Sequence, residues 1–465
     1  MNNTKKYIKK EYFILLIIIV FAFILRVYSL SSSPFWIDEH ISSIVSQNII
    51  SHGTPQLDSG ILYTRAILFH YFQALSFLIL GVSDFSARFP SILFGLATIF
   101  LAFLLGREFD KNKFPIIGLL SALFTTIFFL EVVFSRQARF YQLFQFLFFL
   151  TILFLYKSEK SEKYAWLALV SLIILINTHL AGIILAPAAV YLFYKDKKPL
   201  KFFIMPLILI MFYLFDSISV FSTNSEVIAS QAEAYSHTFF NFFRAFLILS
   251  IIGVYFSYKN NKKLTLLLLI PSIILFASVF FAKTYALRYL YFITLPLLIF
   301  FSSLLVKIKD GSKLLFIIEV LFAVIYPSNL IFTQNELTVI YPEKINYYSI
   351  SEPALEYSFS EENIKKINYS NIICLWAAGC QWYLKKPSYF IPFSMNSLKT
   401  GYFIKDNRDR YTNTPVFNPD SYKGFILVED YFGYSKLNST EREKHDLLKK
   451  DCILLEETSS VKFFN

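Results

Sequence analysis

Long apolar runs alternate with short polar segments from residue 13 to about residue 333. Most runs are roughly 16–22 residues long, the length at which an α-helix crosses the hydrocarbon core of a bilayer. They predict membrane spans at about residues 13–30, 87–106, 114–134, 140–156, 163–179, 181–194, 200–217, 239–257, 264–282, 287–306 and 313–333. We therefore expect an all-α polytopic membrane protein with about 11 transmembrane helices.

Two further apolar segments precede the second span. The run at 66–80 would extend only about 22 Å as a helix, which is shorter than the roughly 30 Å hydrocarbon core. From residue 38 to residue 50, apolar residues recur at helical spacing. If 66–80 crossed the membrane, the positive clusters that follow it would change sides. We therefore interpret both segments as surface helices in the first outer loop.

The charge pattern gives the orientation. The net charge is +11 and the mean hydropathy +0.52. Lysines and arginines gather before the first span and in alternate short loops, whereas residues 217–237 carry two acids and no Lys or Arg. Short positive loops are typical of the cytoplasmic side, so the N-terminus is expected in the cytoplasm. A nucleic-acid-binding function has little support, because no basic stripe follows a soluble domain.

The last part of the chain has a different character. It is polar, with short β-type runs at 371–375, 388–392 and 423–428 and a charged helical stretch at 439–450. We predict a transmembrane catalytic domain at 1–334 and a small extracytoplasmic α/β domain at 335–465. If the latter lies outside the cell, Cys374 and Cys380 could form a disulfide; we expect buried free thiols instead.

Candidate catalytic residues lie just after the first span. Asp38 and Glu39 are adjacent acids, which either cap a surface helix or include the general base of an enzyme. Arg65, Arg139 and Arg288 fall on the outer side in the predicted topology. Each could extend its charge to the membrane surface, or the three could bind a phosphate group through their guanidinium forks.

An ordered set of motifs resembles a known family. The segments RVYSL…FWIDEH, YTRAILFHYF, SDFSARFPSILFGLATIFLAFLLGREF and FSRQARFYQL are similar to the integral-membrane GT-C glycosyltransferases. The nearest branch holds the protein O-mannosyltransferases, the aminoarabinose transferases and bacterial glycosyltransferase 39-like proteins. The resemblance covers residues 20–145 well and the rest through hydropathy and the segment RYLYFITLP.

The resemblance implies a polyprenyl-phosphate-sugar donor and a reaction on the extracytoplasmic face of the cell membrane. Asp38 matches the family's first-loop acid, Glu39 its neighbour, and Arg65 a basic residue near the donor phosphate. Where the aminoarabinose-transferase motif has an acid before that basic residue, this chain has Thr64. The second-loop acid of the branch is also missing from the stretch 138–141, which argues against protein mannosylation.

The residue types fit this chemistry. A base takes the proton of the acceptor hydroxyl, and fixed cations stabilise the departing phosphate. Tyr141 and Tyr289 could donate to phosphate, stack on sugar or pack against lipid. His40, His70 and His179 are candidate substrate-lining residues. Each step along a helix turns by about 100°, so Asp38 and His40, two positions apart, diverge and do not predict a metal site. We expect no required cofactor, and the sequence does not decide whether a divalent metal binds.

Three functions are compatible with this pattern. The first is a glycosyltransferase that moves a sugar from a polyprenyl-phosphate donor to a hydroxyl of a glycan, lipid or protein. The second is a transporter or flippase for lipid-linked sugars, and the third is a non-catalytic assembly protein. Polar residues that cluster at one face, rather than at mid-membrane, favour the enzyme over a transporter. Glu131 could be structural or face the acceptor.

Overall fold

The computed structural model describes residues 2–31, 34–111, 114–219, 247–281 and 291–313, and shorter stretches between 372 and 464. The chain forms two compact units. One holds residues 1–30 and 88–350, and the other holds residues 31–87 together with 351–465. The predicted division at 334/335 lies outside the described residues and stays a prediction.

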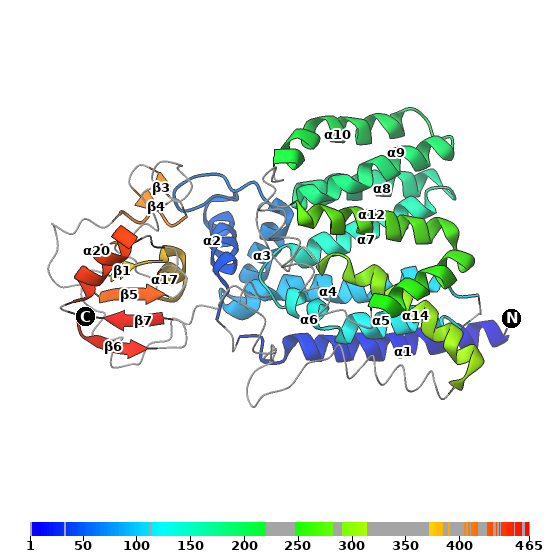
Figure 1. The fold of residues 1–465 in the computed structure, drawn as a ribbon, viewed down its shortest axis with the longest axis horizontal. Coiled ribbons are helices and arrows are strands. Elements are labelled where there is room, and N and C mark those ends of the chain that lie inside the picture. The colour runs from blue at the N-terminus through cyan, green and yellow to red at the C-terminus, as the bar shows by residue number, and fades with distance from the viewer. Residues whose placement is uncertain are drawn as a thin grey trace. The chain divides into compact units, whose positions relative to one another are not determined.

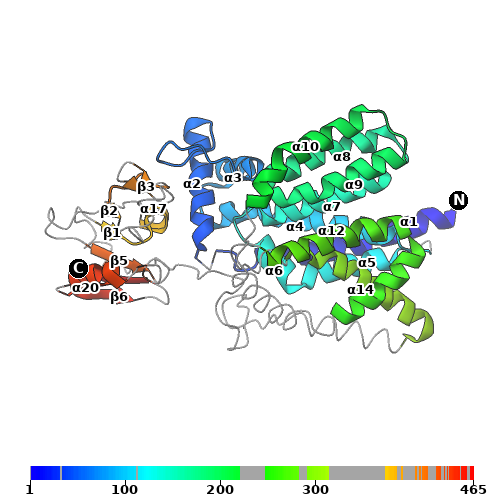
Figure 2. The same ribbon diagram turned by 45° about the horizontal axis from the view of Figure 1, so that its top comes forward.

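The first unit is helical. Its described elements are α1 (Asn2–Val27), most of α4 (Asp84–Arg107), α5 (Ile116–Ile127), α6 (Phe129–Ser135), α7 (Tyr141–Lys157), α8 (Glu162–Thr178), the 3₁₀ helix η1 (Leu180–Ile184), α9 (Leu185–Lys195), α10 (Lys201–Ser219), a helix through residues 247–260, α12 (Lys262–Phe280) and α14 (Thr294–Gly311). Figures 1 and 2 show α8, α9 and α10 side by side. Helix α5 packs against both α1 and α14. Most predicted spans are therefore helices.

Close helix packing in this unit depends on small residues. Leu15 and Ile18 of α1 pack with Phe103 of α4 and with apolar residues of α5. A Cβ added at Gly106 would come within 2.9 Å of the Gly118 Cα, so α4 and α5 touch backbone to backbone there. Small residues at such crossings are typical of helices that associate in lipid, where dispersion replaces the hydrophobic effect.

The outward faces of several helices are apolar. On α1, Phe13, Leu16, Ile17 and Ile24 are each more than half exposed. By length and composition, α4 and α12 could cross a bilayer, whereas α3 (Ile67–Leu80), α5 and α7 are shorter apolar helices. Exposed apolar faces of this extent suit lipid rather than water.

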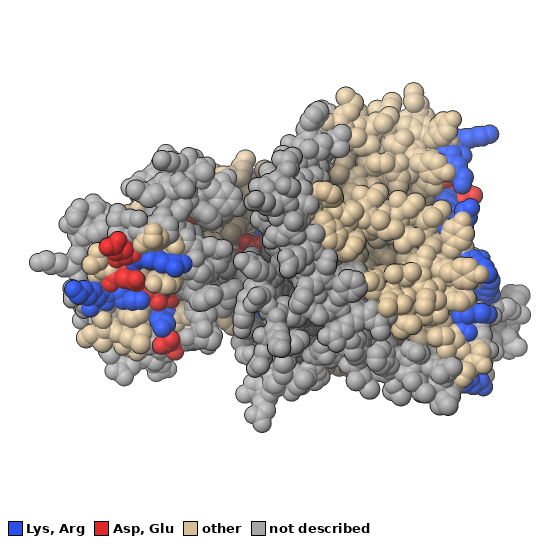
Figure 3. Space-filling view, viewed as in Figure 1, with Lys and Arg blue, Asp and Glu red and all other residues tan. Residues whose placement is uncertain are grey.

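The basic loops meet at one end of the helical unit. Lys263 contacts Glu159 at 2.8 Å and Asp196 at 3.7 Å, and Lys157 contacts Glu108 at 3.7 Å. These pairs join the loops that follow α4, α7 and α9 to the start of α12. Figure 3 shows Lys and Arg gathered along that end. The described loops therefore share one end of the helical unit, and the membrane side on which they lie stays a prediction.

One predicted span is broken. Residues 114–134 form α5 and α6, because Phe128 has extended backbone angles (φ −65°, ψ 127°) that interrupt the helix. The break leaves helix-end carbonyls without their usual partners. The buried Arg26 guanidinium donates to two of them, Thr126 O at 3.1 Å and Thr125 O at 3.2 Å. Hydrophobicity alone predicted a continuous helix and missed this cation.

The segment predicted as a span at 181–194 also differs. Extended backbone at His179 (φ −158°, ψ 133°) ends α8, and the chain continues as η1 and then α9. A Cβ at Gly182 would come within 2.6 Å of the Leu175 side chain, so η1 packs tightly on α8. The lack of a Cβ at Gly182 permits this turn.

The second unit begins with two helices that the sequence predicted. They are α2 (Ile37–His52) and α3 (Ile67–Leu80). A polar contact joins them, since the Ser46 hydroxyl donates to Gln73 Oε1 at 2.6 Å. The opposite face of α3 is apolar and outward, with Leu78 66% and Ile79 70% exposed. Such a face suits a helix in contact with lipid, while the surface position itself stays a prediction.

The rest of this unit contains a mixed sheet. Its strand order is β2-β1-β5-β7-β6, built from β1 (Ile372–Cys374), β2 (Tyr389–Phe390), β5 (Ile426–Asp430), β6 (Leu454–Glu457) and β7 (Val461–Phe464). Strand β1 runs parallel to β2 and β5, whereas β7 runs antiparallel to β5 and β6. The helix α17 (Ala377–Leu384) lies between β1 and β2 in sequence, and α20 (Ser439–Lys449) precedes β6. A small hairpin of β3 (Ile404–Lys405) and β4 (Arg408–Asp409) is separate. The predicted α/β character is therefore seen in the described stretches.

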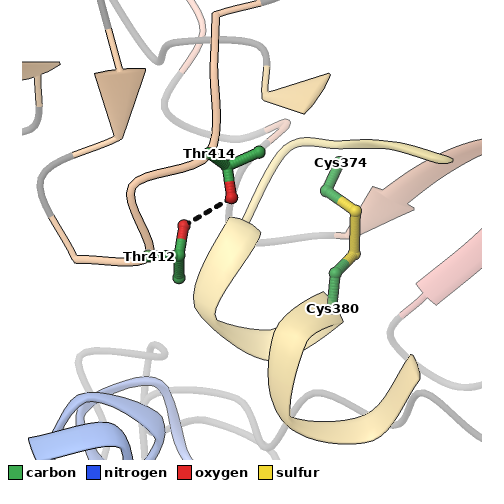
Figure 4. Close-up of a disulfide and its surroundings, with 4 residues drawn as sticks. All are labelled: Cys374, Cys380, Thr412 and Thr414. Carbon is green, nitrogen blue, oxygen red and sulfur yellow. Dashed lines mark hydrogen bonds between the residues drawn. A yellow bond between two sulfur atoms is a disulfide. The ribbon is translucent and has the colours of Figure 1, made fainter. Parts of the chain in front are cut away.

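The cysteine expectation was wrong. Cys374 and Cys380 form a disulfide, which joins the end of β1 to α17 (Figure 4). Both residues are fully buried. The tight turn from β1 into α17 brings the two Cα atoms to 6.6 Å, within reach of a disulfide. Spacing along the sequence does not report this turn, so it did not decide between thiols and a disulfide. Cys452 is a free thiol.

A buried acid beside this region predicts pH-dependent stability. Asp409 Oδ2 accepts from the backbone N–H groups of Tyr411 and Thr412 and from the Thr412 hydroxyl. Thr412 in turn pairs with the Thr414 hydroxyl (Figure 4). Burial raises the pKa of Asp409 from 3.8 to about 6. A carboxyl with a raised folded-state pKa stabilises fully below its unfolded pKa and loses that contribution as the pH rises through the folded value.

We therefore expect the turn at 411–416 to lose protection from hydrogen exchange, relative to its intrinsic rate, between about pH 4 and pH 6.5. Asp409→Asn keeps an acceptor oxygen and cannot ionise, so its protection should stay flat over this window. Hydrogen exchange followed by mass spectrometry across the pH range makes the comparison. Equal slopes in the two proteins would contradict the assignment to Asp409.

Candidate functional site

The first turn of α2 places two neighbouring acids in different surroundings. Glu39 is buried, and its Oε2 accepts from the backbone N–H of Trp36 at 2.8 Å, which caps the helix. Asp38 is only half-buried. An acid in the first turn is favoured by the positive end of the helix dipole. The geometry thus gives Glu39 a structural bond, and Asp38, the more exposed of the two, stays the predicted proton acceptor.

The other predicted residues of this unit are placed as follows. The imidazole of His40 is buried between the rings of Phe35 and Tyr383, whose centroids both lie 5.6 Å away. His70 is also buried, with Nδ1 3.5 Å from the Ser46 hydroxyl. Arg65 is exposed and lies two residues before α3. Among the described residues, no three or more His, Cys, Asp and Glu are grouped to hold a metal ion.

Two arginines of the helical unit hold the end of α1. The Arg136 guanidinium donates to the carbonyls of Tyr28 at 2.7 Å and Ser29 at 3.2 Å, and Arg88 donates to the Leu30 carbonyl at 2.7 Å. Terminal helix carbonyls have no intrahelical partners, and cations near them are favourable. These two side chains therefore have structural partners.

Arg139, Tyr141 and His179 come together around one aromatic ring. Arg139 is 4% exposed, and its guanidinium carbon lies 5.0 Å from the Phe140 centroid and 5.7 Å from the Tyr141 centroid. The His179 ring lies 5.9 Å from the Phe140 ring. Its Nδ1 accepts from the Ala181 N–H at 3.1 Å, so in the neutral form the proton is on Nε2. The sequence predicted these three residues separately, and the structure groups them.

The positive surroundings of this cluster suit an anion. Arg139 lies two residues before α7, whose amino end carries the positive end of its helix dipole. A buried guanidinium beside a helix amino end is a favourable place for phosphate oxygens. The remaining predicted donor-phosphate residues, Arg288 and Tyr289, lie outside the described part of the chain.

Glu131 has structural partners. It is buried, Oε1 accepts from Gln145 Nε2 at 2.8 Å and from the Thr294 hydroxyl, and Oε2 accepts from the Tyr291 hydroxyl at 3.3 Å. The network joins α6, α7 and the start of α14. Of the two alternatives left open for Glu131, the structural one is favoured, because its hydrogen bonds hold helices together.

One group of contacts in the unit that holds Asp38 was not predicted from the sequence. Tyr383 and Trp382 of α17 both donate to the carboxylate of Asp84, at 2.9 and 2.8 Å. These partners lie 299 and 298 positions apart in the chain. The hydropathy pattern depends only on residues within one helix or strand, so it could not have predicted that Asp84 contacts Trp382 and Tyr383.

Comparison with known proteins finds a match to a family model over part of the chain and a fold shared with solved structures. Residues 64–221 match the family model described as dolichyl-phosphate-mannose-protein mannosyltransferase. No curated protein sequence matches the chain. Among solved structures, ArnT from Cupriavidus metallidurans is similar in the apo state, with a TM-score of 0.60 at 10% identity over 97% of each chain. The same protein bound to undecaprenyl phosphate gives a TM-score of 0.58 over 97% of each chain at 10% identity.

A third similar structure is the archaeal oligosaccharyltransferase AglB from Archaeoglobus fulgidus, in complex with an inhibitory peptide and a dolichol-phosphate. Its TM-score is 0.51 at 13% identity, over 81% of this chain and 63% of AglB. The chain thus spans less than two thirds of that protein's length, whereas it matches ArnT end to end. The chain therefore resembles the mannosyltransferase family over residues 64–221 and shares the fold of ArnT.

Proposed function

We propose that the protein transfers a sugar from a polyprenyl-phosphate-sugar donor to a hydroxyl acceptor on the extracytoplasmic face of the cell membrane. The observation that carries the proposal is the half-buried Asp38 in the first turn of α2, beside a Glu39 that caps the helix. Similar folds were solved with undecaprenyl phosphate and with a dolichol-phosphate, which supports a lipid phosphate as the donor's leaving group.

The proposed reaction balances without an added reagent. The Asp38 carboxylate takes the proton of the acceptor hydroxyl, and the acceptor oxygen forms a bond to the anomeric carbon. The bond between that carbon and the phosphate oxygen breaks, and its electron pair leaves with the polyprenyl phosphate. A glycosidic bond and a free lipid phosphate are the products.

Fixed cations are assigned to the phosphate. Arg139 is the described residue best suited to this role, because it is buried and close to a helix amino end. Arg65, Arg288 and Tyr289 are assigned with it from the sequence. His40, His70, Tyr141 and His179 remain predicted substrate-lining residues, and the packed imidazoles of His40 and His70 point to a role in shaping the unit.

The proposed orientation predicts a labelling pattern. In a Cys452→Ser background, Lys160→Cys in a basic loop should be shielded from an impermeant thiol reagent in intact cells, while Leu447→Cys on α20 should react. Both positions are exposed, so burial does not explain a difference. Labelling after permeabilisation is the control. Reaction of Lys160→Cys in intact cells would show that the basic loops lie outside and that the proposed orientation is wrong.

The transfer itself is tested with purified protein. Radiolabelled polyprenyl-phosphate sugars are offered together with membrane extract, and the labelled product is identified. Label that moves from the lipid to a glycan, lipid or protein supports the proposal. Label that stays on the lipid but changes leaflet in vesicles would favour a flippase, and label that does neither would favour an assembly protein.

A further inference from the structure

The contacts between α17 and the start of α2 link the disulfide region to the acid-bearing helix within one unit. The hydroxyl of Tyr383 accepts from the Phe35 N–H at 2.6 Å and donates to Asp84 Oδ2 at 2.9 Å. Phe35 directly precedes Trp36, whose own N–H is bonded by Glu39. The chain entering the first turn of α2 is thus held at two successive amides, one by Glu39 and one by Tyr383.

Ring packing supports the same placement. The Trp382 ring stacks on Phe35 with centroids 4.9 Å apart, and Trp382 Nε1 donates to Asp84 Oδ1 at 2.8 Å. Gln381 donates to Asp58 in the loop between α2 and α3. Three consecutive side chains of α17 therefore bond to the segment 35–84. The Phe35 and Trp382 rings are almost wholly buried, so apolar packing reinforces these part-buried bonds.

The disulfide holds α17 in register. Cys380 lies one residue before Gln381, and Cys374 ends β1, a strand bonded to both β2 and β5. The covalent link ties the helix to the interior of the sheet. A short helix such as α17 is marginal alone, and this link limits its freedom before Tyr383 meets its partners.

We propose that Tyr383 is a positioning residue for Asp38, acting through the Phe35 amide and Asp84, and that the Cys374–Cys380 disulfide keeps α17 in place for this role. The inference rests on the proposed function for its catalytic part. Its structural part, that the Tyr383 hydroxyl holds the start of α2, does not. Small displacements of a base cost rate because proton transfer needs hydrogen-bond distance to the acceptor.

The test uses the full-length protein and the variant Tyr383→Phe, which removes one hydroxyl and keeps the ring. We expect the Phe35 amide to exchange with solvent at least about 10-fold faster, and single-turnover transfer to slow about 5- to 50-fold. Donor affinity should stay within about twofold, because the side chain does not contact the phosphate in this proposal. Tyr434→Phe is the matched control, since it removes an exposed tyrosine hydroxyl bonded to Asp446 in the same unit.

A double variant separates positioning from a general loss of structure. In the Asp38→Asn background, Tyr383→Phe should cause no further loss of rate, since the base that it positions is gone. A multiplicative loss would overturn the proposal. Unchanged hydrogen exchange at the Phe35 amide in Tyr383→Phe would also overturn it. Faster exchange at that amide with a wild-type transfer rate would overturn it as well. If Trp382→Phe slows transfer as much as Tyr383→Phe, anchoring of Asp84 is the cause and the role of Tyr383 at Phe35 is wrong.

The disulfide is tested by reduction. Dithiothreitol should speed hydrogen exchange at the Phe35 amide in the wild type. It should have no effect on a Cys374→Ser, Cys380→Ser double variant, whose Phe35 amide already exchanges faster because the disulfide is missing. No change in the wild type would remove the disulfide from the proposal. If the wild type transfers sugar from no lipid donor, the proposed function fails, and the exchange measurements still decide whether Tyr383 holds α2.

Discussion

Asp38→Asn should lower the single-turnover transfer rate by about 10²–10⁴, the usual contribution of general base catalysis. Asparagine keeps the shape of the side chain and its place in the first turn of α2, but it cannot accept the acceptor's proton at neutral pH. Donor affinity should change little, because the carboxylate is not assigned to the phosphate. The measurement is rapid-quench transfer with a labelled lipid-linked sugar at saturating enzyme.

Glu39→Gln is the matched control for this variant. It removes the same charge from the neighbouring residue and retains an oxygen that can accept from the Trp36 N–H, so the helix cap survives. We expect its rate within about threefold of the wild type. Full activity in Asp38→Asn with loss in Glu39→Gln would exchange the two roles and make Asp38 the structural acid.

Arg139→Ala should weaken donor binding about 10- to 150-fold. A charge-assisted hydrogen bond to phosphate contributes roughly 1.5–3 kcal/mol, and every 1.4 kcal/mol is a factor of ten in affinity. Some rate is lost as well, because the departing phosphate loses a stabilising cation. Arg139→Lys should recover only part of the affinity, since lysine lacks the planar fork and its fit beside Phe140.

Lys201→Ala serves as the control for Arg139→Ala. Lys201 also contacts aromatic rings, with its Nζ 5.5 Å from the Trp166 centroid, but it begins α10 just after one of the basic loops. Donor affinity should be unchanged in this variant. Isothermal titration with polyprenyl phosphate measures both. Normal affinity in Arg139→Ala would show that this arginine is held for packing and that the phosphate is bound elsewhere.

The elements that the sequence predicted well are those with a strong local period. The helices α2, α3, α4, α7, α8 and α20 all lie within a few residues of their predicted positions. Hydrophobic runs and the 3.6-residue period are properties of one segment, so they need no knowledge of partners. The shared end of the basic loops followed from charge alone for the same reason.

The features that the sequence did not predict depend on distant partners. The break at Phe128 is stabilised by Arg26, a residue about 100 positions earlier. The structural role of Glu131 depends on Tyr291 and Thr294, 160 and 163 positions later. In each case a buried polar group is satisfied across helices, which local hydropathy does not report. Asp38 could be named in advance because an acid next to an apolar span is conspicuous by itself.

The discontinuous make-up of the second unit has a consequence for synthesis. Asp84 leaves the ribosome 299 residues before Tyr383, which corresponds to about 15–60 s at the usual 5–20 residues per second. During that interval the segment around Phe35 has been made without the side chains that bond to it. A premature stop codon before Ala377 would remove α17 altogether, so the segment around Phe35 would never gain these bonds. Such a truncation in the last quarter of the chain would therefore disturb the helix start that carries Asp38 and Glu39.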